Sequence, residues 1–169
     1  MRVATREGTQ PKRAWGARLL GAGLAAVAAL GVAAGPAAAA AVRPVLVPGN
    51  PPAICPDGSA ALRLDPSDDG TQIPVTIPGD GSGTITATFH QAPGADPDTL
   101  VDFTTTGSIA VHQATVKGGP NANRYVYTAP TFPNGIAADE DLVSPTNPGG
   151  QIPPISHVDF CFTSDRYYG

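Results

Sequence analysis

The side chains that could do chemistry in this sequence are few, and they stand far apart. The two cysteines, Cys55 and Cys161, are separated by most of the second part of the chain. The three histidines, His90, His112 and His157, include no pair at the close spacing that zinc ligands usually have. The sequence therefore predicts no transition-metal site and no cofactor.

One acidic segment begins in the way that a calcium-binding loop begins. Asp65, Ser67 and Asp69 place side-chain oxygens at its first, third and fifth positions, and Gly70 occupies the sixth. The twelfth position is Thr76, where such loops carry a glutamate that binds the ion with both oxygens. We therefore expect a solvated acidic turn, and weak calcium binding by this loop stays open as the alternative.

His157 raises the question of hydrolytic chemistry. In a strand, Ser156 and His157 would point to opposite faces and could not form a nucleophile and base pair, although Asp159 could orient the imidazole. The more distant Ser108 and Ser144 lack the glycine pattern of a nucleophile elbow. We expect His157 to be a hydrogen-bonded structural residue that caps a backbone carbonyl of the neighbouring 117–123 loop.

The elements that must position these residues are short strands separated by glycine, proline and small polar residues. Strands are expected at 60–64, 73–77, 84–90, 100–105, 109–117, 124–127 and 155–162, with a long irregular stretch at 129–154. In the last of them Val158, Phe160 and Phe162 share one face, which we expect to enter the core. The pattern predicts an all-β protein, a single antiparallel β-sandwich or barrel-like domain over residues 55–169.

The beginning of the chain has the three parts of a secretory signal peptide, which we place at residues 1–41. A basic stretch from Arg2 to Arg18 precedes an apolar run from Leu19 to Val32, and alanines follow up to Ala41. We expect the exported protein to start between residues 40 and 43. The next segment, 42–54, is rich in proline and valine and is expected to be extended, as a linker or an edge strand.

Removal of the signal peptide makes the chain strongly acidic. Residues 42–169 carry five basic and thirteen acidic side chains, which is a net charge of −8. Such a surface repels phosphate groups, so we expect no binding to nucleic acid and, after signal cleavage, none to membranes. The predicted product is a secreted or extracellular monomer, and association with the cell wall stays open.

Export also bears on the two cysteines. Both would reach a compartment in which disulfides form, and the chain has no third cysteine to compete. We predict a bond between Cys55 and Cys161 that ties the first ordered segment to the last strand. Closing a loop of this length stabilises a protein by about 4–5 kcal/mol on the chain-entropy model.

Three separated motifs resemble a known family. They are the turn Lys117-Gly118-Gly119, the strand Tyr125-x-Tyr127 and the final strand Ile155-Ser156-His157-x-x-Phe160-Cys161. In this order they are similar to small β-rich modules of exported and surface proteins of Gram-positive bacteria, over residues 116–162. That family has no established enzymatic activity. The resemblance implies a disulfide-closed extracellular β domain and supplies no catalytic residue.

The function most consistent with these features is a non-catalytic secreted or cell-surface β module that binds a glycan or another extracellular ligand. Tyr125 and Tyr127 would share a strand face and could stack against sugar rings if exposed, with Lys117 and His157 as further contacts. Packing of both tyrosines in the core is the alternative interpretation. A second function also stays open, a secreted hydrolase or inhibitor whose site is assembled from distant loops around His157.

Overall fold

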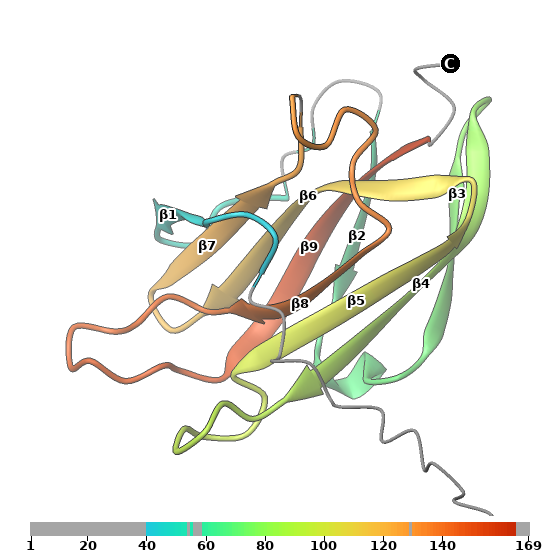
Figure 1. The fold of residues 1–169 in the computed structure, drawn as a ribbon. Helices are drawn as coiled ribbons and strands as arrows, with labels where there is room; N and C mark the ends of the chain where they lie inside the picture. Colours follow the sequence, from blue (N-terminus) through green and yellow to red (C-terminus); the bar gives the residue numbers. More distant parts are fainter. Residues whose placement is uncertain (1–39, 54, 56–58, 129, 165–169) are drawn as a thin grey trace, which may run out of the picture. The chain divides into compact units, whose positions relative to one another are not determined.

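The computed structural model describes residues 40–53, 55, 59–128 and 130–164, and this part of the chain is almost entirely β (Figure 1). Its strands form two antiparallel sheets, which confirms the expected all-β sandwich. Within the described ranges, no helix has the length and hydropathy required to cross a membrane. Of the expected signal peptide, all but the last two residues lie outside the described residues.

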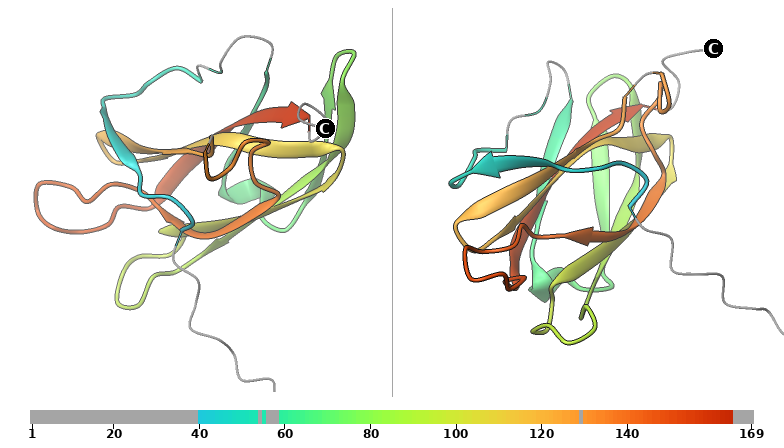
Figure 2. Two further views of the ribbon diagram at one scale, coloured as in Figure 1. Left: turned by 45° about the horizontal axis from the view of Figure 1, so that its top comes forward. Right: turned by 60° about the vertical axis from the view of Figure 1, so that its left-hand side comes forward.

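The first sheet has five strands in the order β1-β7-β6-β9-β2. Their bounds are β1 Val45–Pro48, β7 Asn121–Val126, β6 Ile109–Gly118, β9 Ile155–Ser164 and β2 Ala60–Leu64. The long strands β6 and β9 lie at its centre and pair along almost their whole length. Strand β1 comes from the proline-rich segment 42–54 and lies at the edge beside β7 (Figure 2). The sheet therefore includes residues that precede Cys55.

The second sheet has four strands in the order β3-β4-β5-β8. Their bounds are β3 Gln72–Ile77, β4 Gly81–His90, β5 Leu100–Gly107 and β8 Ala138–Val143. Strands β3, β4 and β5 follow one another as hairpins. At Gly83 a Cβ atom would overlap the carbonyl oxygen of Thr106 and the side chain of Ile109, so glycine is required where these strands approach.

The core lies between the inward faces of the two sheets. Strand β4 contributes Ile85, Ala87 and Phe89, which are buried, while the intervening residues are more exposed, as period-two alternation requires. Val158, Phe160 and Phe162 of β9 are fully buried, as predicted. Because side chains from both sheets fill the same layer, burial of apolar surface there holds the sheets together.

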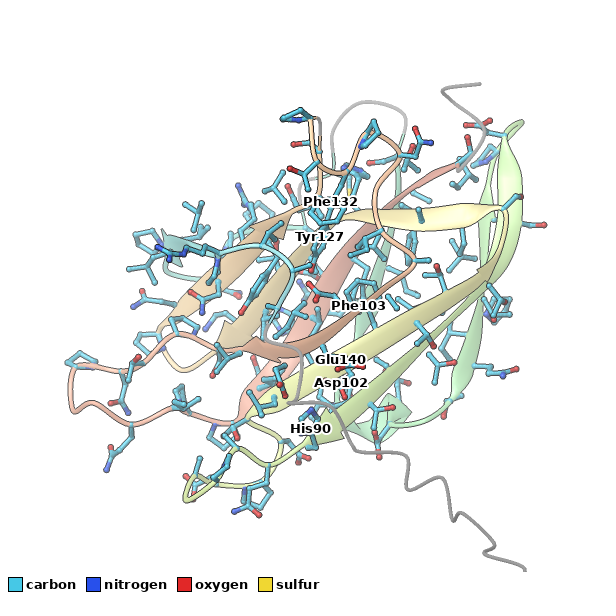
Figure 3. All side chains as sticks on the ribbon, in the orientation of Figure 1. His90, Asp102, Phe103, Tyr127, Phe132 and Glu140 are labelled. Atoms are coloured by element: carbon cyan, nitrogen blue, oxygen red, sulfur yellow. A yellow bond between two sulfur atoms is a disulfide. The ribbon has the colours of Figure 1, made fainter. Side chains whose placement is uncertain are left out.

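Aromatic rings join the sheets at the centre of this core. The ring of Phe103 on β5 packs edge to face on Phe160 of β9 at 5.3 Å and on Tyr127, just after β7, at 6.1 Å. Phe132 packs in the same way on the other side of Tyr127 (Figure 3). Edge-to-face packing adds a directional preference to simple burial, so these contacts favour one alignment of the two sheets.

Strand β8 corrects the prediction that residues 129–154 are irregular. It pairs with β5 through a register shift between Val101 and Phe103, and Leu142 is its main contribution to the core. Its sequence, ADEDLV, is poor in the β-branched and aromatic residues that indicate a strand. Pairing with an already formed neighbour therefore outweighs local propensity in this segment.

The disulfide between Cys55 and Cys161 is present, as predicted. The two Cα atoms lie 5.4 Å apart, and the bond links positions separated by 106 residues. Cys161 on β9 pairs directly with Ala61 on β2. The disulfide therefore anchors the segment that leads into the edge strand β2 to the centre of the five-stranded sheet.

Candidate functional site

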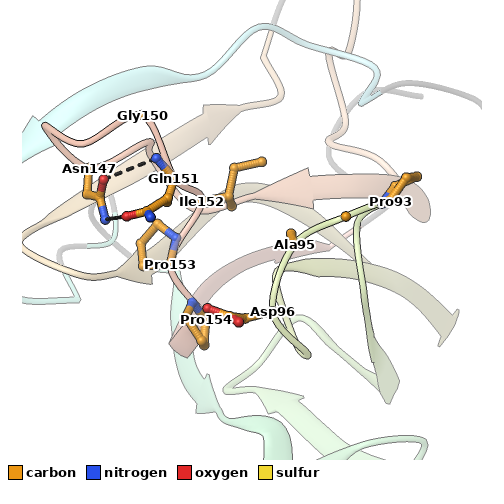
Figure 4. Close-up of a pocket in the computed structure, with 10 residues that line it drawn as sticks. Pro93, Ala95, Asp96, Asn147, Gly150, Gln151, Ile152, Pro153 and Pro154 are labelled. Carbon is orange, nitrogen blue, oxygen red and sulfur yellow. Dashed lines mark hydrogen bonds between the residues drawn. The ribbon is translucent and has the colours of Figure 1, made fainter.

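Two long loops at one end of the sandwich enclose a pocket of about 610 Å³ (Figure 4). One loop, residues 91–99, joins β4 to β5, and the other, residues 144–154, joins β8 to β9. The pocket is lined by Pro93, Gly94, Ala95 and Asp96 from the first loop and by Asn147, Gly150, Gln151, Ile152, Pro153 and Pro154 from the second. A β-sandwich commonly binds ligands through such end loops, which a rigid scaffold positions.

The second loop is held by its own hydrogen bonds. The side-chain oxygen of Asn147 accepts the backbone N–H groups of Gly149 at 3.0 Å and Gln151 at 3.1 Å. The backbone N–H of Asn147 donates to the carbonyl of Gln151 at 2.9 Å. At the base of the loop, the Ser144 hydroxyl donates to the carbonyl of Pro153 at 2.6 Å. These bonds hold one wall of the pocket in a defined conformation.

The first loop is closed by Thr99, whose side chain is fully buried. Its hydroxyl accepts the N–H of Ala92 at 2.9 Å and donates to the carbonyl of Asp96 at 3.2 Å. The first loop is also tied to the start of β9, directly after the second loop, because the N–H of Ile155 donates to the carbonyl of Asp98 at 2.7 Å. The pocket is thus preformed on both sides, which lowers the entropy lost when a ligand binds.

The pocket offers hydrogen-bonding groups and little charge. Asn147 and Gln151 carry amides that both donate and accept, and among the lining residues that the structure describes Asp96 alone is ionisable. Proline rings and Ile152 provide the apolar surface. This combination suits a neutral polar ligand better than an anion, since the described lining residues include no lysine or arginine.

A second group of polar side chains gathers on the outer face of the four-stranded sheet. His90 Nε2 lies 2.9 Å from Asp102 Oδ1 and 3.7 Å from Asp141 Oδ1, and each side chain is about one third exposed (Figure 3 labels the first two). Asp102 Oδ1 also accepts the backbone N–H of Asp141 at 2.8 Å. One ligand atom from each residue lies within 4.8 Å of the other two, so this group could hold a metal ion.

Three strands bring this group together. His90 ends the outward-facing series of β4, and Asp102 lies on β5 at the register shift with β8. Asp141 has a positive φ of 56°, a conformation that aspartate tolerates better than most residues. Sequence reasoning missed this group, since its members are 12 and 39 residues apart and meet only through the strand register.

Tyr125 and Tyr127 are buried, at 1% and 0% exposed. The Tyr125 hydroxyl accepts the N–H of Val143 at 2.9 Å, and the Tyr127 hydroxyl donates to Asp139 Oδ2 at 2.7 Å. Burial raises the pKa of both phenols, and the Asp139 carboxylate raises that of Tyr127 further. A sugar ring cannot stack on either residue, so the exposed-platform interpretation is wrong and the alternative of core packing is correct.

Lys117 and His157 are also largely enclosed. The Lys117 ammonium donates to the carbonyl of Gly119. His157 Nε2 is buried and lies 3.7 Å from Asp159 Oδ2, whose carboxylate is already held by Arg63. Burial lowers the pKa of the His157 imidazole, and the Arg63 guanidinium lowers it further. Neither residue presents its charged or titrating atom openly to a ligand.

Ser156 departs from the expectation that it points away from His157. Its hydroxyl lies 3.4 Å from His157 Nδ1, and it donates to the carbonyl of Lys117 at 3.1 Å. It is therefore Ser156, and not His157, that caps a carbonyl of the 117–123 loop. A serine hydroxyl that donates to a backbone carbonyl directs its proton away from the imidazole, which is the reverse of nucleophile activation.

The acidic turn uses its oxygens internally. Asp65 begins the short 3-10 helix Pro66–Asp68, and its Oδ1 accepts the N–H of Ser67 at 2.9 Å and the hydroxyl of Ser67 at 2.6 Å. These bonds lower the pKa of Asp65. Asp69 Oδ1 instead accepts the N–H of Phe89 on β4 at 2.8 Å. The oxygens of Asp65 and Asp69 serve a helix cap and a strand, which supports the interpretation as a structural turn over calcium binding.

The fold and its end loops define a disulfide-closed antiparallel β-sandwich with a preformed, weakly charged pocket. No protein-family model, curated protein or solved structure matches this chain.

Proposed function

We propose that this chain is an exported, non-catalytic binding module that holds a neutral extracellular glycan in the pocket between the β4–β5 and β8–β9 loops. The observation that carries the proposal is the pocket itself, about 610 Å³ between two loops that are braced by their own hydrogen bonds. The export signal and the resemblance to modules of Gram-positive surface proteins support an extracellular location. An association with the cell wall would place such a module beside abundant glycans.

The lining favours a glycan over other ligands of the same size. Sugar hydroxyls both donate and accept hydrogen bonds, and the amides of Asn147 and Gln151 can satisfy both roles. The Asp96 carboxylate can accept from a hydroxyl pair. The net charge of −8 after residue 41 works against anionic glycans, nucleic acids and lipid headgroups.

Calorimetric titration with a panel of neutral oligosaccharides, including uncharged cell-wall fragments, tests this proposal. Gln151→Ala and Asp96→Ala remove lining side chains but keep the backbone bonds of both residues that complete the loop turns. The one loop bond lost is the long contact of 3.5 Å from the Asn147 amide to Gln151 Oε1. Each should weaken binding by roughly 2- to 10-fold, the net value of one hydrogen bond. Gln72→Ala, an exposed amide on β3, is the matched control and should leave the affinity unchanged. Binding that both lining variants leave intact contradicts the proposal.

A second candidate function is the binding of a divalent cation by His90, Asp102 and Asp141. Ligands about 2.0–2.1 Å from a tetrahedral zinc ion lie roughly 3.4 Å apart, and the His90 distances of 2.9 and 3.7 Å bracket that value. Imidazole and carboxylate ligands together suit Zn²⁺ rather than Ca²⁺, which prefers oxygen alone. The partly exposed position would leave coordination sites for water or a ligand group.

The remaining alternative, a hydrolase or inhibitor built around His157, has less support. Ser156 is the one hydroxyl within hydrogen-bond distance of that imidazole among the described contacts, and its proton is directed to the carbonyl of Lys117. Asp159 is held by Arg63 through both oxygens. Assay against chromogenic esters and glycosides, with His157→Gln as the comparison, distinguishes the two proposals, since turnover that requires His157 favours the enzyme.

A further inference from the structure

The carboxylate of Asp139 is buried inside the sandwich. The residue is 7% exposed, although it belongs to the acidic run of β8. It accepts three hydrogen bonds, from the Tyr127 hydroxyl at 2.7 Å, from the N–H of Glu140 at 2.9 Å and from the N–H of Ala41 at 2.8 Å. All three donors are neutral groups in the uncleaved chain, so the negative charge itself is not balanced by them.

A cationic partner for this carboxylate is missing from the described part of the chain. The ion pairs found there involve Asp159, Asp102 and Asp141, and none reaches Asp139. An unpaired charge in a protein interior is unfavourable, and proteins usually balance it with an opposite charge. The backbone nitrogen of Ala41 lies beside Asp139 Oδ1, at the place where a cationic group could pair with the carboxylate.

Ala41 lies at the end of the expected signal peptide. Signal peptidases cut after small residues in an A-x-A pattern, and cleavage between Ala40 and Ala41 would place Ala38 and Ala40 at the two recognised positions. That cut converts the nitrogen of Ala41 from an amide into an α-ammonium group. Its 2.8 Å distance to Asp139 Oδ1 already equals that of a charge-assisted hydrogen bond between an ammonium and a carboxylate.

We propose that export processing cuts the bond between Ala40 and Ala41 and that the new α-ammonium group, on an exposed residue, forms a partly buried ion pair with the enclosed carboxylate of Asp139. The proposal rests on the expected signal peptide and is independent of the ligand of the pocket. Val42, the next residue, packs against the core and holds the new terminus in place. Cleavage would therefore supply the charge that Asp139 lacks and fasten the segment that leads into β1.

The stabilities of three forms of the protein distinguish the contribution of this ion pair from that of ordinary packing. One begins at Ala41 with a free amine, one begins at Ala41 with an acetylated amine, and one begins at Ala40. Equilibrium unfolding should give the free Ala41 form a folding constant at least tenfold larger than the acetylated form, because acetylation removes the charge and keeps one N–H that can donate to Asp139. The free Ala40 form should also be weaker, since its ammonium lies one residue away from the carboxylate.

Asp139→Asn is the decisive variant, with Asp80→Asn, a carboxylate outside this contact, as its matched control. The difference between the free and acetylated forms should vanish in Asp139→Asn and persist in Asp80→Asn. If Asp139→Asn does not fold, the α-amine of the native protein provides a second readout, since pairing with Asp139 keeps the amine protonated and should slow its reductive methylation severalfold relative to the Ala40 form. Mass spectrometry of the exported protein should find Ala41 as the first residue. A different first residue, or equal stability of the free and acetylated forms, overturns the proposal.

Discussion

Arg63 and Asp159 lie opposite each other on β2 and β9, and the guanidinium holds both carboxylate oxygens, at 2.7 and 2.9 Å. Asp159 is buried at 3% exposed, while the Arg63 side chain is half exposed. The pair thus secures the edge strand β2 from its solvent side. The disulfide also ties this edge to β9, from Cys161, two residues beyond Asp159, to Cys55 in the segment that precedes β2.

Replacing Arg63 should therefore measure how much the pair with Asp159 contributes to the stability of the protein. Arg63→Ala leaves a buried carboxylate without its two donors, and we expect a loss of about 2 kcal/mol in the free energy of unfolding. Arg63→Lys should recover part of this, since it restores the charge and not the paired geometry. Urea denaturation measures both, with the exposed Arg43→Ala as control. An equal, negligible effect of Arg63→Ala and Arg43→Ala would contradict the prediction.

The disulfide should be the largest single stabilising element. The double variant Cys55→Ser/Cys161→Ser should lose about 2–5 kcal/mol, because its unfolded chain regains the freedom that the bond removes. The double change also avoids leaving one free thiol. The native protein should show no titratable thiol before reduction. Detection of two free thiols in the folded monomer would be incompatible with the bond described.

Tyr127 should resist ionisation in the folded protein. Burial and the neighbouring Asp139 carboxylate raise its pKa, so the folded state favours the neutral phenol. This contribution to stability is complete below the unfolded pKa of about 10 and is lost as the pH rises above it. Phenolate absorbance should show that Tyr127 ionises only as the protein unfolds at alkaline pH. Tyr127→Phe should reduce the alkaline loss of stability, and it should cost about 1–3 kcal/mol at neutral pH by leaving Asp139 with one donor fewer.

His157 should have a lowered pKa in the folded protein, whereas that of Tyr127 is raised. Burial, with the nearby Arg63 charge, lowers its pKa, so folding favours the neutral imidazole. The corresponding stability is present above the unfolded pKa of about 6.5 and is lost as the pH falls through the lower folded value. Proton NMR titration of the histidine ring signals should place His157 below the value of a free histidine. His112, whose pKa is also lowered by burial, should behave likewise, and His157→Gln separates the two contributions.

The outer group of His90, Asp102 and Asp141 should bind one Zn²⁺ per chain if it is a cation site. Calorimetry with the tag-free protein should detect this binding, and Co²⁺ should show the visible absorption of tetrahedral coordination. His90→Gln and Asp141→Asn should each weaken binding at least tenfold, and asparagine preserves the positive φ at position 141. Asp80→Asn is the control. Binding that survives both ligand variants would place the ion elsewhere.

The parts of the fold that could be predicted from sequence are those in which local pattern and environment agree. Strand β4 alternates Ile85, Ala87 and Phe89 with threonines, and β9 alternates Val158 and Phe160 with other residue types, so the inward faces of both strands can be identified directly. The disulfide followed from counting, because only one pairing was possible.

Strand β8 could not be predicted for a physical reason. Asp139 is typical of a solvated charge run, and two of the three hydrogen bonds that it accepts in the interior come from the Tyr127 hydroxyl and the Ala41 N–H, both distant in sequence. The same limit applied to Tyr125 and Tyr127. Their spacing indicates a shared strand face, but which face meets the core depends on how the two sheets stack.

The Cys55–Cys161 bond also has a mechanical consequence. It makes residues 55–161 a closed covalent ring, which contains both pocket loops and all of the second sheet. Tension applied through the two ends of the chain would pass across the sulfur–sulfur bond, and only the arms outside the ring could extend. A protease cut in either pocket loop would likewise leave both fragments joined until a reductant is added. If the protein is tethered at the cell surface, its binding loops are therefore shielded from pulling forces.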